Sequence, residues 1–162
     1  MTRRPGTVGG PGSGGRGGLP LLPTILLVDP DEDAGAMVRD AMLEGTGPFD
    51  LRTVTAGSEL TAYLVAQDDP ARPNPTLILV DLDTSNGDAV DAIASLKRAP
   101  ETRRIPVIAL TRDQDEERIV RAYDAGANTV LPRPVTFLAL VRLMKVFSAY
   151  WLEAAALPKR AA

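Results

Sequence analysis

Short runs of aliphatic residues alternate along this chain with longer stretches in which apolar residues recur at helical spacing. Several runs are apolar throughout, as in strands covered on both faces, and their alternation with helical stretches is typical of parallel sheets joined by crossover helices. The pattern predicts strands over residues 24–28, 51–54, 76–80, 106–110 and 129–131. It therefore predicts an α/β fold, a doubly wound parallel sheet of five strands with five helices.

The last predicted helix, from about Thr136, is apolar around most of its circumference. A stripe about 100° wide is enough to cover a sheet, so the surplus predicts a homodimer through this helix. The alternative is that residues 152–158 fold back and cover the surplus within one chain. The predicted interface consists of Leu138, Val141, Phe147, Tyr150 and Trp151, with Val146 on the same surplus surface.

The pattern places one domain over residues 24–158 of the 162-residue chain. Residues 1–23, rich in Gly and Pro, are predicted to be a flexible tail, and residues 159–162 a short C-terminal tail. The tail contains a GxGxxG pattern at Gly12, Gly14 and Gly17, but no strand precedes it, so a nucleotide site is not expected.

Composition removes several classes of function. Cysteine and histidine are both absent, which excludes disulfides, thiolate or histidine metal sites and Ser-His-Asp catalysis. The net charge of −3 argues against a nucleic-acid partner. The acidic segment 29–33 follows the apolar run 19–28 directly, which argues against an export signal or a membrane span. We therefore expect a cytoplasmic protein.

Chemically capable residues follow four of the predicted strands: Asp29, Asp81, Thr111 and, two residues beyond its strand, Arg133. Ligands of open parallel sheets bind beyond the carboxyl ends of the strands, so these side chains should converge. Two carboxylates, a hydroxyl and a cation are suited to acyl-phosphate chemistry, in which one carboxylate attacks phosphorus and the other helps to hold Mg²⁺.

Several segments resemble the receiver domains of bacterial response regulators. They are ILLVD at 25–29, PTLILVDLD at 75–83, RRIPVIALT at 103–111 and GANTVLPRPV at 126–135. The last two, with AYWLEAAALP at 149–158, look most like the small response regulators that partner phytochrome-type histidine kinases. The resemblance covers about 24–158 and implies a flavodoxin-like receiver fold.

The resemblance also implies roles for single residues. Asp81 matches the phosphoacceptor, and Asp29 matches one of the acids on the first loop. Asp83 stands where the family uses a backbone carbonyl, so that Asp29, Asp81 and Asp83 would form the Mg²⁺ site. Thr111 matches the switch hydroxyl, and Arg133 takes the place of the phosphate-binding lysine.

The chain departs from the family pattern at several positions. Pro30 replaces the second acid of the first loop, which predicts weak Mg²⁺ binding. Val130 stands in place of the switch aromatic, and the loop after Asp81 reaches Gly87 about two residues early. Pro134 matches a proline whose preceding peptide is usually cis.

Structural interpretations of the same residues remain open. Asp29 is also a possible N-cap, with Pro30 at the first helical position, and Thr111 could cap a helix beginning near Asp113. Asp81 could simply accept backbone N–H bonds.

The first functional hypothesis is a single-domain response regulator that receives a phosphoryl group on Asp81 from a sensor histidine kinase and signals by protein contact. The second is a pseudo-receiver that signals without phosphate. An enzyme on the same scaffold ranks below both, because no Gly-rich phosphate loop follows the first strand.

Overall fold

The computed structural model describes residues 22–55, 57–66, 69–83, 88–112 and 114–158. The predicted C-terminal tail and nearly all of the N-terminal one, with the GxGxxG pattern, lie outside these residues. In the described part of the chain, no helix is long and apolar enough to cross a membrane.

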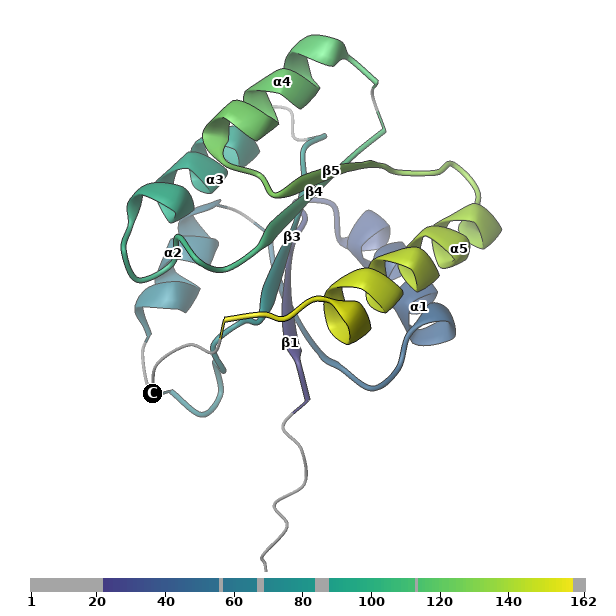
Figure 1. The fold of residues 1–162 in the computed structure, drawn as a ribbon, viewed down its shortest axis with the longest axis horizontal. Helices are drawn as coiled ribbons and strands as arrows, with labels where there is room; N and C mark the ends of the chain where they lie inside the picture. The colour runs from purple at the N-terminus through teal and green to yellow at the C-terminus, as the bar shows by residue number, and fades with distance from the viewer. Residues whose placement is uncertain (1–21, 56, 67–68, 84–87, 113, 159–162) are drawn as a thin grey trace, which may run out of the picture.

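The centre of the molecule is a parallel sheet of five strands in the order β2-β1-β3-β4-β5 (Figure 1). All five predicted strands are confirmed, each within one residue at either end. Residues of β1, β3 and β4 are buried throughout, because helices cover both faces of the sheet there, whereas β2 and β5 form its partly exposed edges. The strands are β1 (Thr24–Val28), β2 (Asp50–Val54), β3 (Leu77–Asp81), β4 (Val107–Thr111) and β5 (Thr129–Pro132).

Helices lie on both faces of the sheet, as the doubly wound prediction requires. α1 and α5 pack together on one face, and α2, α3 and α4 lie on the other (Figure 1). The helices are α1 (Glu32–Gly45), α2 (Gly57–Val65), α3 (Asp88–Arg98), α4 (Glu116–Ala125) and α5 (Phe137–Ser148), the last continued by a π-helical segment, η1 (Ala149–Ala154).

Side-chain caps fix where three of these helices begin. The carboxylate of Asp31 accepts from the first turn of α1, Asp115 caps α4 and Thr136 caps α5. The interpretations of Asp29 and Thr111 as N-caps are therefore wrong. Each lies too early in the chain, because its helix begins only after the loop that leaves the sheet.

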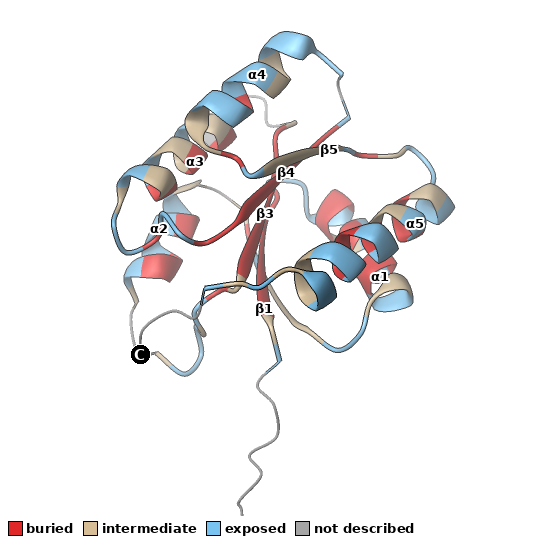
Figure 2. Cartoon of the chain, in the orientation of Figure 1, coloured by how far each residue is buried: buried red, intermediate tan, exposed pale blue. Residues whose placement is uncertain are grey.

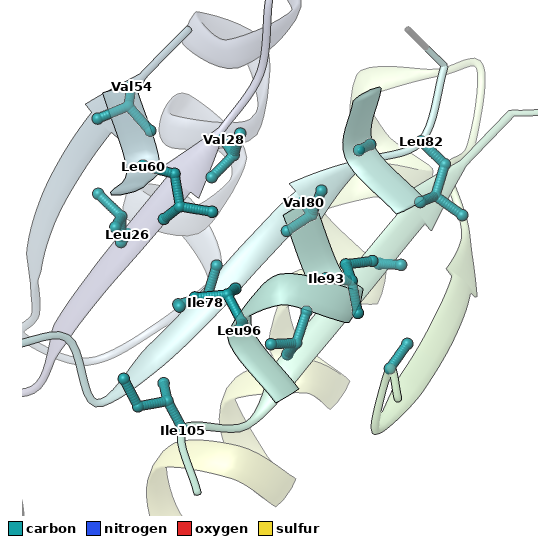
Figure 3. Close-up of a cluster of buried hydrophobic side chains, with 14 of the residues drawn as sticks. Leu26, Val28, Val54, Leu60, Ile78, Val80, Leu82, Ile93, Leu96 and Ile105 are labelled. Carbon is teal, nitrogen blue, oxygen red and sulfur yellow. The ribbon is translucent and has the colours of Figure 1, made fainter. Parts of the chain in front are cut away.

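Two apolar layers flank the sheet, and buried residues concentrate along its strands and the inner faces of the helices (Figure 2). Figure 3 shows part of the layer under α2, α3 and α4, where Leu60, Ile78 and Ile93 are almost fully buried. The other layer, under α1 and α5, includes Met42 and Leu140. Each large side chain buried in this way stabilises the fold by roughly 1.5–3 kcal/mol.

The structure corrects part of the predicted dimer interface. Val141 and Phe147 are buried within the chain, at 8% and 3% exposure, because they lie on the face of α5 that packs on α1 and the sheet. Trp151 is half-buried and packs on the same layer. Leu138 and Tyr150 remain exposed, at 62% and 57%.

The C-terminal segment packs back on the molecule. The π-helical turns of η1 end at Ala155, whose N–H donates to the carbonyl of Tyr150. Leu152 and Leu157 then pack on the layer under α1 and α5. The alternative that residues 152–158 fold back is thus partly realised, although Leu138 and Tyr150 stay exposed.

Lys97 joins α3 to the beginnings of β4 and β5. Its Nζ donates to the carbonyls of Arg103 and Ile105, at 3.1 and 2.8 Å, and to Oδ1 of Asn128 at 2.9 Å. The stem of Lys97 runs beneath Gly126, where an added Cβ would lie 2.6 Å from the lysine Cγ. Gly126 ends α4 with φ 108°, a backbone conformation that favours glycine.

Candidate functional site

Four predicted site residues converge at the carboxyl ends of the strands. Asp29 follows β1, Asp81 ends β3, Thr111 ends β4 and Arg133 follows β5. All four are buried, with exposures of 4% or less. Because β1, β3, β4 and β5 are neighbours in the sheet, residues more than 100 positions apart meet at one edge.

Arg133 is the centre of this cluster. Its Nη1 donates to Oδ2 of Asp81 at 2.5 Å and lies 3.5 Å from Oδ2 of Asp29. Its Nη2 donates to the carbonyl of Ala34, in α1, at 2.7 Å. The guanidinium thus contacts both carboxylates and the first turn of α1, while the Arg133 N–H donates to the carbonyl of Thr111.

Backbone N–H groups orient the two carboxylates. Oδ1 of Asp29 accepts from the N–H of Asp31 at 2.9 Å, and Oδ1 of Asp81 accepts from the N–H of Asp83 at 2.7 Å. Oδ2 of Asp29 has no hydrogen-bond partner, alone among the buried side-chain polar atoms of the described residues.

Burial changes the acidity of both groups. Burial, with a smaller contribution from the charge of Asp81, raises the pKa of Asp29 to about 6, although the Asp31 N–H and Arg133 act to lower it. Burial also raises the pKa of Asp81, against the lowering effects of the Asp83 N–H and Arg133.

The carboxylate of Asp83 faces β4 and α4. It accepts from the Thr111 hydroxyl at 3.1 Å, from the Arg112 N–H at 2.7 Å and from Nη1 of Arg118 at 3.1 Å. Arg118 lies on α4, so Asp83 connects the segment after β3 to that helix. The backbone of Asp83 donates to the phosphoacceptor candidate, so the two parts of the site share this residue.

A family model for the response regulator receiver domain matches residues 25–145. The chain belongs to the response-regulator receiver family. Response regulator Rcp1 of Synechocystis sp. (strain ATCC 27184 / PCC 6803 / Kazusa) is 28% identical over 135 residues, which cover 83% of this chain and 92% of Rcp1. The sequence resemblance is thereby confirmed.

Solved structures agree with this assignment. The phosphorylated cyanobacterial phytochrome response regulator RcpA matches with a TM-score of 0.77 and 29% identity, over 86% of this chain and 100% of that one. The Mn²⁺-bound form of Rcp1 matches with a TM-score of 0.74 and 28% identity, over 85% and 99%. The chain is a receiver of two-component signalling with the flavodoxin-like fold, similar to phytochrome response regulators.

The receiver differs from the expected pattern at its fifth strand. Among the described residues no peptide is cis, so the bond before Pro134 is trans. Val130, in place of the switch aromatic, is half-buried against the layer under α2, α3 and α4. Its N–H donates to the hydroxyl of Tyr123, at 3.1 Å, so an aromatic residue of α4 contacts this strand instead. The short loop with Gly87 lies outside the described residues.

The arrangement does not fit a divalent ion as it stands. Among the described residues no group of three or more acids is placed to hold a metal. Oδ1 of both Asp29 and Asp81 accepts a backbone N–H, Oδ2 of Asp81 accepts from Arg133, and both carboxylate oxygens of Asp83 are engaged. Of the carboxylate oxygens of these three acids, Oδ2 of Asp29 is the one without a hydrogen-bond partner. The remaining acid of the first loop, Asp31, caps α1. Octahedral Mg²⁺ coordination needs several free oxygens.

Sequence reasoning missed three participants. The carbonyl of Ala34 is a backbone group with no sequence signature, and Arg118 is one of many arginines in the chain. Asp31 could have been found, since an aspartate before Glu32 and Asp33 is a common start of a helix.

Proposed function

We propose that the receiver accepts a phosphoryl group on Asp81 from a sensor histidine kinase and passes the signal on by protein contact. The observation that supports this proposal is the bond between Asp81 and Arg133 at one buried end of the sheet, where Thr111 ends the neighbouring strand. A carboxylate oxygen of Asp81 would attack phosphorus as the bond to the donor nitrogen breaks. Arg133 would then exchange its bond to Oδ2 for the phosphoryl oxygens.

The class of kinase that we propose as the partner is inferred from relatives of this chain. RcpA is described as a cyanobacterial phytochrome response regulator, which supports a phytochrome-type kinase as the partner of this chain. The cytoplasmic location expected from the sequence is part of the same proposal. The Mn²⁺-bound form of Rcp1 supports a divalent metal in relatives, and Mg²⁺ in this chain remains a proposal of weak binding.

A second function, signalling without phosphate, is favoured by one specific observation. Oδ2 of Asp81 is covered by a guanidinium that also holds Asp29 and Ala34. The Thr111 hydroxyl is held by Asp83. In a pseudo-receiver this closed arrangement would be permanent.

Intact-mass measurement after incubation with a small phosphodonor and Mg²⁺ separates the two functions. Wild type should gain the mass of one phosphoryl group, and Asp81→Asn should gain none. Asp91→Asn, which changes an exposed aspartate of α3, is the matched control and should behave as wild type. A phosphoryl group retained by Asp81→Asn would refute the assignment to Asp81. No gain in any protein would favour the pseudo-receiver.

We also propose that the receiver forms a homodimer through the outer face of α5 and η1. Leu138, Val146 and Tyr150 are 62%, 68% and 57% exposed, although neighbouring positions of the helix are buried. A two-fold partner would cover the same apolar side chains on both copies.

A further inference from the structure

The strongest unexplained feature of the molecule is a buried arginine placed between two buried carboxylates. The Arg133 side chain is 1% exposed, and those of Asp29 and Asp81 are 2% and 5% exposed. Water is therefore excluded from all three charged groups. Two carboxylates in such a place need a counter-charge, since burying them unpaired is strongly unfavourable.

The guanidinium already supplies this counter-charge. Nη1 donates to Asp81 and lies 3.5 Å from Asp29, so one nitrogen is shared by both acids. Nη2 donates to the Ala34 carbonyl at 2.7 Å, so a second nitrogen of the same guanidinium is also held. Arg133 is thus anchored on the site from two sides.

We infer that Arg133 is the resident cation of this site, occupying the region between Asp29 and Asp81 and excluding divalent metal from it until the guanidinium is displaced. Metal and guanidinium compete for the same oxygen of Asp81 and repel each other at short range. Weak metal binding was expected from the missing acid at Pro30. The contacts of Arg133 give a second, independent reason to expect it.

The competition between metal and Arg133 can be tested directly. Mn²⁺ binding to the unphosphorylated protein is measured by electron paramagnetic resonance. Arg133→Lys and Arg133→Ala should each bind Mn²⁺ at least about tenfold more tightly than wild type. Lysine replaces the anchored guanidinium by a single ammonium group, and alanine removes the positive charge. Arg121→Ala is the control. It removes one positive charge from α4 at a residue that pairs with Glu117 and not with Asp29, Asp81 or Asp83, and its Mn²⁺ affinity should change far less.

Thermal unfolding keeps the inference testable if Arg133→Ala folds poorly. In chelator, Arg133→Lys should melt below wild type, and added Mg²⁺ should raise its midpoint while leaving that of wild type nearly unchanged. Equal Mn²⁺ affinities for wild type and both Arg133 variants would overturn the inference, as would a Mg²⁺ response of wild type equal to that of Arg133→Lys. Neither readout needs a phosphodonor, so failure of phosphorylation at Asp81 is a separate result.

Discussion

The hydroxyl of Thr111 donates to the carboxylate of Asp83 across 3.1 Å, which ties the end of β4 to the segment that follows β3. The same carboxylate accepts from Arg118, so α4 is held to the site through a side chain. The switch hydroxyl of Thr111 therefore donates to Asp83 and not to Asp81. Phosphorylation would have to break this bond before Thr111 could contact the phosphoryl group.

Asp83→Ala should release all three contacts of this carboxylate. The Thr111 hydroxyl, the Arg112 N–H and the Arg118 guanidinium each lose a hydrogen-bond acceptor, and we expect a loss of about 1–3 kcal/mol in the free energy of unfolding. Hydrogen exchange of the α4 amides should accelerate more than that of α1. Urea unfolding and exchange followed by mass spectrometry measure the two effects.

Arg121→Ala provides the control for this prediction. Arg121 pairs with Glu117 on the same helix, but their side chains are 66% and 72% exposed, so removal should cost about 0.5 kcal/mol or less. Equal losses for Asp83→Ala and Arg121→Ala would show that Asp83 does not hold α4.

The raised pKa of Asp29 predicts a dependence of stability on pH. Its value of about 6 lies above the ordinary 3.8, so the folded chain binds the proton more tightly than the unfolded chain. The contribution of Asp29 to the free energy of unfolding is therefore fully present below about pH 4, and it is lost as the pH rises through about 6. Asp29→Asn should therefore be more stable than wild type at pH 7, by about 1–3 kcal/mol, with a flatter profile.

Urea unfolding in chelator from pH 4 to pH 8 tests this prediction. Asp40→Asn, at a carboxylate that is 60% exposed, should keep the wild-type slope. A variant Asp29→Asn less stable than wild type at neutral pH would show that its attraction to Arg133 exceeds the cost of burying its charge.

The dimer proposal predicts that charge on the outer face of α5 separates the subunits. Val146→Asp and Tyr150→Asp should shift sedimentation from dimer to monomer while circular dichroism stays unchanged. Val65→Asp changes a residue that is 72% exposed on α2, on the opposite side of the sheet, and should leave the dimer intact. A wild type that is monomeric at micromolar concentration would refute the proposal.

Adjacent residues of α5 should differ sharply in their effect on stability. Phe147 is 3% exposed and Val146 is 68% exposed. Phe147→Ala leaves a cavity in the layer under α1 and α5 and should cost about 3–5 kcal/mol, whereas Val146→Ala in monomeric conditions should cost about 0.5 kcal/mol or less. Comparable losses in urea unfolding would contradict the described orientation of the helix.

Gly126→Ala should be destabilising for two reasons. The position has φ 108°, and a Cβ there would lie 2.6 Å from the Lys97 side chain. We expect a loss of about 1–3 kcal/mol in urea unfolding. Gly47→Ala, where a Cβ would meet nothing within 4 Å, is the control and should be close to neutral. A neutral Gly126→Ala would mean that α4 ends differently in solution.

The strands could be predicted closely because short, continuous aliphatic runs such as Ile25 to Val28 are typical of strands that are covered on both faces, and these residues are buried. The helix starts were harder, since the acids of the segment 29–33 compete to cap α1. Which one does so depends on tertiary contacts, and Asp29 faces Arg133 instead.

The outer face of α5 could have been defined better from the sequence. Helical spacing already places Leu140, Met144 and Phe147 on one side, and the structure buries them together. The closing of the site by Arg133 could not be predicted, because its second anchor is the backbone carbonyl of Ala34.

Lys97 and Arg133 occupy sites that make opposite demands on the geometry of a basic side chain. Its three acceptors surround a single nitrogen, and a guanidinium, whose donors are spread over a plane, cannot direct three bonds from one point. Arg133 meets the opposite requirement, since its acceptors lie on different elements and need two nitrogens. Lys97 therefore stands where bonds radiate from one atom, and Arg133 stands where they reach acceptors on two different elements.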